Sequence, residues 1–200
     1  MQGTDKLTHI FVLHLVKTQL NLYNGHIEVA KKTFIDAEPL LEISKGISIF
    51  HTHYLLVKIR LGLAMAKKQR NAGENTGKEI RELLKTSKKL ISKSKKMVGN
   101  LTEAYILRAN IFLFNQKFKK AFKNLQLAIA TSEKYNGRLE LSRACFETGK
   151  FLADPNNKYN ELNGHPAGYY LDKAKAMFEE MDLQWDLEEY KKFVDSTKSR

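Results

Sequence analysis

Apolar side chains recur at intervals of three and four residues along almost the whole chain, and this spacing limits what it can fold into. Such spacing marks one face of an α-helix, whereas a half-buried strand shows strict alternation, which is not sustained anywhere here. Only three prolines interrupt the 200 residues, so long segments lack helix breakers. The sequence therefore predicts an all-α protein without strands.

Breaks in this spacing predict where the helices begin and end. Asn-Gly pairs occur at 24–25 and 136–137, Thr76 can cap the helix after a polar loop, and residues 153–168 form the longest interruption. Short connections imply antiparallel neighbours. Trp185 and Phe193 are expected to pack the last helix onto the preceding hairpin. The predicted helices are 5–23, 26–44, 47–69, 77–98, 101–115, 117–134, 138–153, 167–181 and 184–197.

A series of large and small side chains recurs along the chain. Within 101–134 the first helix contributes Tyr105, Ala109 and Phe112, and the second contributes Phe118, Ala121, Leu125 and Ala128. The second-helix series returns at Ile27, Ala30, Phe34 and Ala37, at Leu171, Ala174, Phe178 and Met181, and in degenerate form at Ile80, Leu83, Ser87 and Leu90. Gly62 and Gly149 are the expected small residues of two other first helices.

This pattern resembles the tetratricopeptide (TPR) repeat, a helix–turn–helix unit of about 34 residues. Arg108 and Glu133 depart from it, since leucine and proline are usual there. The resemblance implies one domain over residues 1–200, a right-handed α-solenoid of about four antiparallel helix hairpins. These hairpins span about 5–44, 47–98, 101–134 and 138–181, and a capping helix follows at 184–197.

Two C-terminal segments, residues 140–154 and 168–192, are similar to the end of the helical-repeat regions of large bacterial signalling proteins. There the repeats follow an ATPase, cyclase or kinase module. That likeness implies a regulatory or scaffolding region, with a possible intramolecular contact to an upstream signalling domain.

Charge and cysteine content indicate the compartment and the classes of partner. The net charge is +12, and it divides into +15 over residues 1–160 and −3 over 161–200. Such a charge permits anionic partners without identifying one. One cysteine, Cys145, fits a reducing compartment, and no signal peptide or membrane span is recognisable. The chain is therefore predicted to be cytoplasmic.

Two basic segments raise the possibility of nucleic-acid binding. Residues 110–130 combine Phe112, Phe114, Phe118 and Phe122 with several lysines, and the repeat pattern favours a core role for the rings over base stacking. The helix predicted at 78–98 is amphipathic, and its polar side carries Lys85, Lys88, Lys89, Lys93, Lys95 and Lys96. A solvated face is favoured over a phosphate-binding one. Lysine also outnumbers arginine, the better residue for bidentate phosphate contacts.

No catalytic, metal or cofactor site is predicted. His51 and His53 lie two residues apart and point to different sides of a helix, and no nucleotide-binding glycine loop is present. Cys145 has no neighbouring base in the sequence, so a buried hydrophobic role is expected.

The favoured function is a non-enzymatic interaction module that binds a peptide or a helix in a concave groove. The alternatives are a nucleic-acid-binding repeat that uses helix 78–98 and a peptide-sensing regulator. The partner and the oligomeric state stay open. Candidate groove residues are Glu103, Ile106, Asn110, Leu113 and Phe114, with Tyr54, Lys58 and Leu61 from the preceding first helix.

Overall fold

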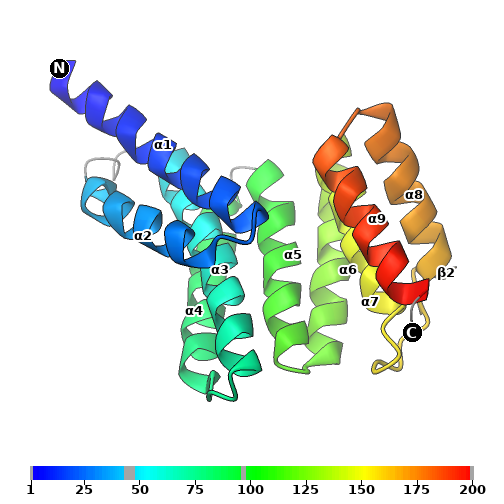
Figure 1. The fold of residues 1–200 in the computed structure, drawn as a ribbon. Helices are drawn as coiled ribbons and strands as arrows, with labels where there is room; N and C mark the ends of the chain where they lie inside the picture. The colour runs from blue at the N-terminus through cyan, green and yellow to red at the C-terminus, as the bar shows by residue number, and fades with distance from the viewer. Residues whose placement is uncertain (1, 43–47, 96–97, 199–200) are drawn as a thin grey trace. The chain divides into compact units, whose positions relative to one another are not determined.

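The computed structural model describes residues 2–42, 48–95 and 98–198, and over these ranges it is all-α except for one very short hairpin of strands (Figure 1). The elements are α1 (Gln2–Tyr23), α2 (Ile27–Ala37), the 3-10 helix η1 (Glu38–Leu41), α3 (Ser48–Asn71), α4 (Gly77–Ser94), α5 (Val98–Phe114), α6 (Phe118–Lys134), α7 (Arg138–Leu152), β1 (Glu161–Leu162), β2 (His165–Pro166), α8 (Ala167–Glu180) and α9 (Gln184–Lys198).

Two predicted helices end earlier than their apolar spacing indicates. The helix predicted at 26–44 stops at Ala37 and tightens into η1, because Pro39 has no N–H to donate and its ring clashes with the preceding turn. The helix predicted at 77–98 ends at Ser94, and Val98 already belongs to α5. Neither proline nor glycine interrupts the apolar spacing at this break, so the spacing does not reveal where the helix ends. Residues 43–44, 47 and 96–97 of these predictions lie outside the described residues.

Thr76 occupies the N-cap position of α4, as predicted, but its side chain makes no capping hydrogen bond. Instead, Asn75 Oδ1 accepts the N–H of Gly77 at 2.8 Å. The start of this helix is therefore stabilised by the neighbouring residue.

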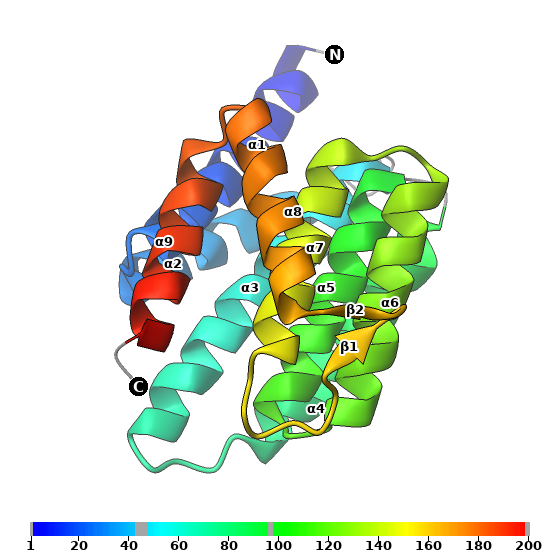
Figure 2. The same cartoon turned by 90° about the vertical axis from the view of Figure 1, so that its right-hand side faces the viewer.

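The expectation that strands are absent is wrong at residues 161–166. β1 and β2 pair antiparallel, with Leu162 opposite His165, and Asn163 and Gly164 form the turn at φ of 50° and 78°. An Asn-Gly turn with both φ positive suits the twist of a two-residue hairpin. The hydroxyl of Tyr170 donates to the carbonyl of Leu162 at 2.8 Å, which fixes the hairpin to the start of α8 (Figure 2).

The chain divides into two compact units, Met1–Asn100 and Leu101–Arg200, called here the N-terminal and C-terminal units. In the N-terminal unit α1 packs on α2 and α3, and α3 packs on α4. The ring of Tyr54 stacks on those of Phe11 and Phe34 at 6.3 and 5.0 Å. A Cβ on Gly62 would lie 2.6 Å from Leu83 Cδ2, so this glycine lets α3 and α4 approach closely.

In the C-terminal unit α7 packs on α6 and α8, and α9 packs on α8 and α7. Phe146 of α7 contacts Tyr190 and Phe193 of α9 at 5.8 and 6.0 Å between ring centroids. Phe193 therefore packs as predicted. Trp185 leaves 52% of its surface exposed.

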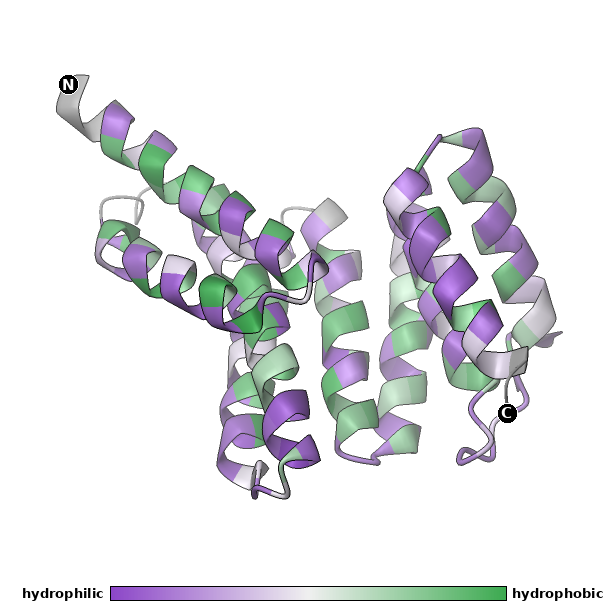
Figure 3. Cartoon of the chain, in the orientation of Figure 1, coloured by the Kyte–Doolittle hydropathy of each residue, from purple (hydrophilic) through white to green (hydrophobic). Residues whose placement is uncertain are grey.

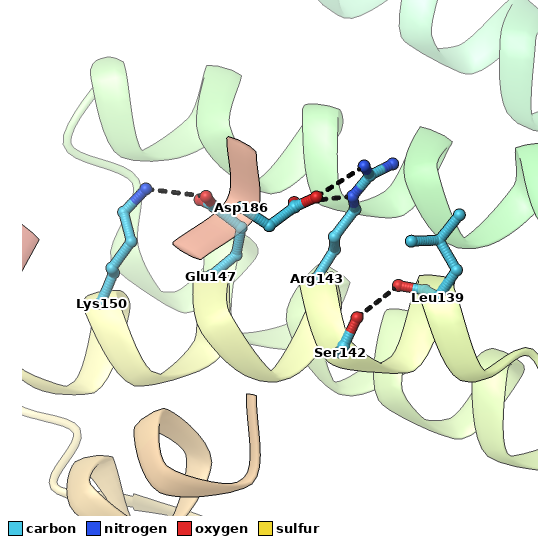
Figure 4. A network of polar contacts seen from close by, with 6 residues as sticks. All are labelled: Leu139, Ser142, Arg143, Glu147, Lys150 and Asp186. Atoms are coloured by element: carbon cyan, nitrogen blue, oxygen red, sulfur yellow. Dashed lines mark hydrogen bonds and ion pairs between the residues drawn. The ribbon is translucent and has the colours of Figure 1, made fainter. Parts of the chain in front are cut away.

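A bidentate ion pair adds a polar connection between α7 and α9. Arg143 Nε and Nη2 donate to the two carboxylate oxygens of Asp186, each at 2.9 Å (Figure 4). Such parallel bonds fix orientation as well as adding stability. The last helix is thus held by rings and by charge.

The recurring large–small series forms buried helix faces. Three members of the series are buried in α2, three in α6 and two in α8. The members at the ends of these series are partly exposed: Ile27, Phe118, Leu171 and Met181. Small side chains at this spacing let helices approach, and the large ones fill the remaining space. The buried members are Ala30, Phe34 and Ala37, then Ala121, Leu125 and Ala128, then Ala174 and Phe178.

Candidate functional site

The eight predicted groove residues differ in how much surface they expose. In the N-terminal unit Tyr54 and Leu61 are each 5% exposed, whereas Lys58 is exposed. In the C-terminal unit Ile106 is 8% exposed. The other four, Glu103, Asn110, Leu113 and Phe114, are partly exposed. Buried side chains contribute to packing first, so Lys58 and these four remain the predicted positions that a partner can reach directly.

Tyr54 belongs to a polar cluster that joins η1 to α3. Its hydroxyl donates to Glu38 Oε1 at 3.0 Å, and Lys58 Nζ lies 4.0 Å from the same oxygen and 5.6 Å from the Tyr54 ring centroid. Burial and the bond to Glu38 raise the pKa of Tyr54 far above its ordinary value, so the hydroxyl stays a neutral donor. The cluster places the Lys58 ammonium group beside Glu38 and the Tyr54 ring.

Lys58 and Leu61 also line a groove of about 320 Å³ in the N-terminal unit. Phe34, Met65 and Leu83 make much of its wall apolar. Two further lining side chains, Gln69 and Glu79, each have a buried acceptor, Oε1 and Oε2, without a hydrogen-bond partner among the described residues. The groove therefore combines an apolar wall with unsatisfied acceptors, and Tyr54 is not part of its lining.

Helix α1 is apolar on two sides. On one side, Phe11, Leu15 and Thr18 are fully buried. On another, Leu13, Val16, Leu20 and Tyr23 are 50, 47, 43 and 49% exposed. Their offsets of three, seven and ten residues place them along one face, here called the α1 stripe. Figure 3 shows hydrophobic residues along most of α1.

One end of the α1 stripe adjoins a hollow of about 190 Å³. The hollow is lined by Gln19, Leu22 and Tyr23 of α1 and by Arg60 and Ala64 of α3. A bulky side chain of a partner lying along the stripe has space to enter there. This surface could not be recognised from the sequence, because apolar residues at helical spacing look alike whether they are covered or exposed.

The structure shows which side chains of the two basic segments are buried and which are exposed. Phe112 is 6% exposed, so its ring is not available to stack on a base, while Phe118 and Phe122 are partly exposed. On α4, Ile80, Leu83 and Leu90 are buried and its lysines are exposed at 85, 88, 89 and 93. Lys95 follows α4 and is also exposed, and Lys96 lies outside the described residues.

No converging set of three histidine, cysteine, aspartate or glutamate side chains occurs within the described ranges. None of the helices described is long and apolar enough to cross a bilayer. Cys145 is fully buried in α7.

We expect the protein to lose stability in alkaline solution, partly because of Cys145. Burial raises the pKa of its thiol from 9.0 to about 11, and burial likewise raises the pKa of Tyr170 to about 12. The unfolded chain releases these protons first, so the stabilisation is complete below pH 9 and is lost as pH rises toward the folded-state values. The Cys145 contribution should fall by about 1 kcal/mol between about pH 8 and pH 10.

Urea unfolding at several pH values measures this effect. The variant Cys145→Ala should show a shallower loss of unfolding free energy over the same interval, whatever its stability at neutral pH. Identical slopes for the two proteins would rule out the thiol as a source.

Comparison of the chain with protein-family models, with curated proteins and with solved structures gives no match. Its function is therefore inferred from its own residues and their geometry.

Proposed function

We propose that this chain is a non-enzymatic, TPR-like helical-repeat module that binds a helical segment of a partner protein along α1. In this proposal its hairpins stack as a right-handed solenoid, and it serves as a regulatory or scaffolding region of a bacterial signalling protein. The α1 stripe is the observation that carries the binding role.

A helix that is apolar on two sides needs cover on both. The side with Phe11 and Leu15 packs inside the N-terminal unit, while Leu13, Val16 and Leu20 leave about half of their surfaces in water. Contiguous exposed apolar surface of this kind marks interaction sites. Burying the remaining halves should contribute about 1 kcal/mol for each large side chain. An amphipathic helix is the partner shape that covers a straight stripe.

The charge of the N-terminal unit specifies the partner further. Its sequence holds 18 basic and eight acidic residues, a net charge of +10, against +2 for the C-terminal unit. On α1 itself, Lys6 and Lys17 are exposed, and no acidic residue occurs between them and Tyr23. The partner helix should therefore carry glutamate or aspartate beside its apolar face, since opposite charge steers association.

A synthetic amphipathic peptide tests this proposal without a known partner. It carries leucines at helical spacing and glutamates elsewhere, and a scrambled peptide of the same composition is its control. We expect the protein to raise the fluorescence anisotropy of the first peptide at concentrations where the second is unaffected. The double variant Leu13→Ser/Leu20→Ser should weaken binding at least about tenfold, or about 1.4 kcal/mol.

The matched control is Val29→Ser/Ile35→Ser, which removes two side chains of α2 that are 53 and 52% exposed. It should change peptide affinity less than about twofold. Equal losses in the two variants, or equal binding of both peptides, would contradict a specific site on α1. Binding of an oligonucleotide in preference to both peptides would favour the nucleic-acid alternative. Light scattering shows whether a second copy of the chain competes for the stripe.

A further inference from the structure

A second hollow, of about 480 Å³, lies in the C-terminal unit between the start of α6 and the loop after α7. Four lysines and two aromatic rings dominate its lining: Lys117, Lys119, Lys120, Lys158, Phe118 and Tyr159. Lys117, Lys119 and Lys120 lie close together in the sequence. The loop after α7 brings Lys158 to them. Hollows of about 300–1,000 Å³ hold small molecules in other proteins.

The positive charge of this hollow is not neutralised by acidic side chains in its lining. No carboxylate belongs to its lining, and among the described residues none of the four lysines forms an ion pair. Lys120 Nζ lies 5.6 Å from the Phe112 ring centroid. Helix α6 begins here, and Lys117 at its N-cap provides no side-chain acceptor for the first N–H groups. Ammonium groups and the positive end of a helix together favour an anion.

The walls of the hollow are held in place by specific contacts. Tyr159 stacks on Phe122 with 4.5 Å between ring centroids and 16° between planes. Its backbone N–H donates to Asn157 Oδ1 at 2.6 Å, and the Asn157 amide donates to the carbonyl of Phe151. On the other side, the N–H of Lys117 donates to the carbonyl of Phe112 at 2.8 Å. These contacts fix the backbone and the Tyr159 ring, so that part of the site loses little entropy when a ligand binds.

We infer that this hollow binds a nucleotide, with the phosphate among the lysines at the start of α6 and the base against Phe118 and Tyr159. Phosphate has the charge that four ammonium groups and helix N–H groups attract. A flat base suits the two partly exposed rings, because stacking on aromatic side chains contributes to nucleotide binding in general. The site lies in the C-terminal unit and does not depend on the proposed role of the α1 stripe.

Isothermal titration calorimetry, which measures the affinity of each ligand, tests this inference with four probes: adenosine monophosphate, adenosine, inorganic phosphate and a short oligonucleotide with a 5′-phosphate. We expect the monophosphate to bind at least about tenfold more tightly than adenosine or phosphate alone, since each fragment lacks one set of contacts. Equal affinity for inorganic phosphate would overturn the role of the rings. Binding of the oligonucleotide without the monophosphate would overturn the choice of a free nucleotide.

Two triple variants separate a site from general attraction to a basic protein. Lys117→Gln/Lys119→Gln/Lys158→Gln removes three positive charges from the hollow, and Lys85→Gln/Lys88→Gln/Lys89→Gln removes three exposed ones from α4. The first should weaken binding of the monophosphate at least about tenfold, and the second less than about twofold. Equal losses would overturn the inference. Unchanged circular dichroism in both variants verifies that they are folded.

Discussion

Replacing Phe178 by alanine is expected to lower the free energy of unfolding by about 3–5 kcal/mol. Phe178 is fully buried in α8, and its ring packs nearly perpendicular to that of Phe146 of α7, with 5.9 Å between the centroids. The same Phe146 ring contacts two residues of α9. The substitution therefore loses transfer free energy, leaves a cavity, and loosens the contact on which three helices depend. Urea unfolding followed by circular dichroism measures the change.

Leu127→Ala is the control for this experiment. Leu127 lies in α6 and is 38% exposed, so its truncation removes less buried surface than that of Phe178 and should cost only about 1–2 kcal/mol. If the two variants lose the same stability, α8 is not packed as the structure shows.

The variant Gly149→Val should be the next most damaging, with a loss of about 2–3 kcal/mol. A Cβ at this position would lie 2.7 Å from Leu171 Cγ and 3.2 Å from the backbone nitrogen of Leu171. A leucine side chain can turn away, but a backbone atom cannot move without α8 moving with it. Valine gains less than about 1 kcal/mol of helix propensity over glycine, so the clash determines the sign.

Gly168 offers a matched control within α8. A Cβ there meets no atom within 4 Å, so Gly168→Ala should leave stability unchanged or slightly raised. Adding Leu171→Ala to Gly149→Val should restore part of the loss if Leu171 is the obstacle. If the double variant is no more stable than the added losses of the two single variants predict, the result would argue against this packing.

The helices were predictable because burial on one side imposes the three- and four-residue spacing. Residues 118–134 and 138–152 match their predicted ranges within about a residue. The errors in the predicted elements have local causes. Pro39 turns the end of one helix into a 3-10 helix, and Asn163 and Gly164 form the turn of a short hairpin inside a predicted loop.

The candidate sites were less predictable than the fold. The repeat resemblance proposes positions such as Lys58 and Leu61, and both line a groove of the N-terminal unit. It cannot distinguish Leu13 and Leu20 from core leucines, because exposure depends on what the other helices cover. The basic hollow was equally hidden, since Lys158 is distant in sequence from Lys117 and only the loop brings them together.

The α1 stripe and the basic hollow lie in different units and favour different kinds of ligand. An apolar, acidic helix suits the first, and a phosphate with a flat base suits the second. Their separate locations mean that variants of one surface serve as controls for the other.

Amide hydrogen exchange with and without the leucine–glutamate peptide tests the central claim most directly, because it reports where on the folded chain the peptide lies. Bound peptide should slow exchange over residues 13–23 of α1 and leave α6 and α8 unchanged. Unaltered exchange over α1 in the presence of saturating peptide, or protection confined to other helices, would contradict the assignment of α1 as the partner-binding helix.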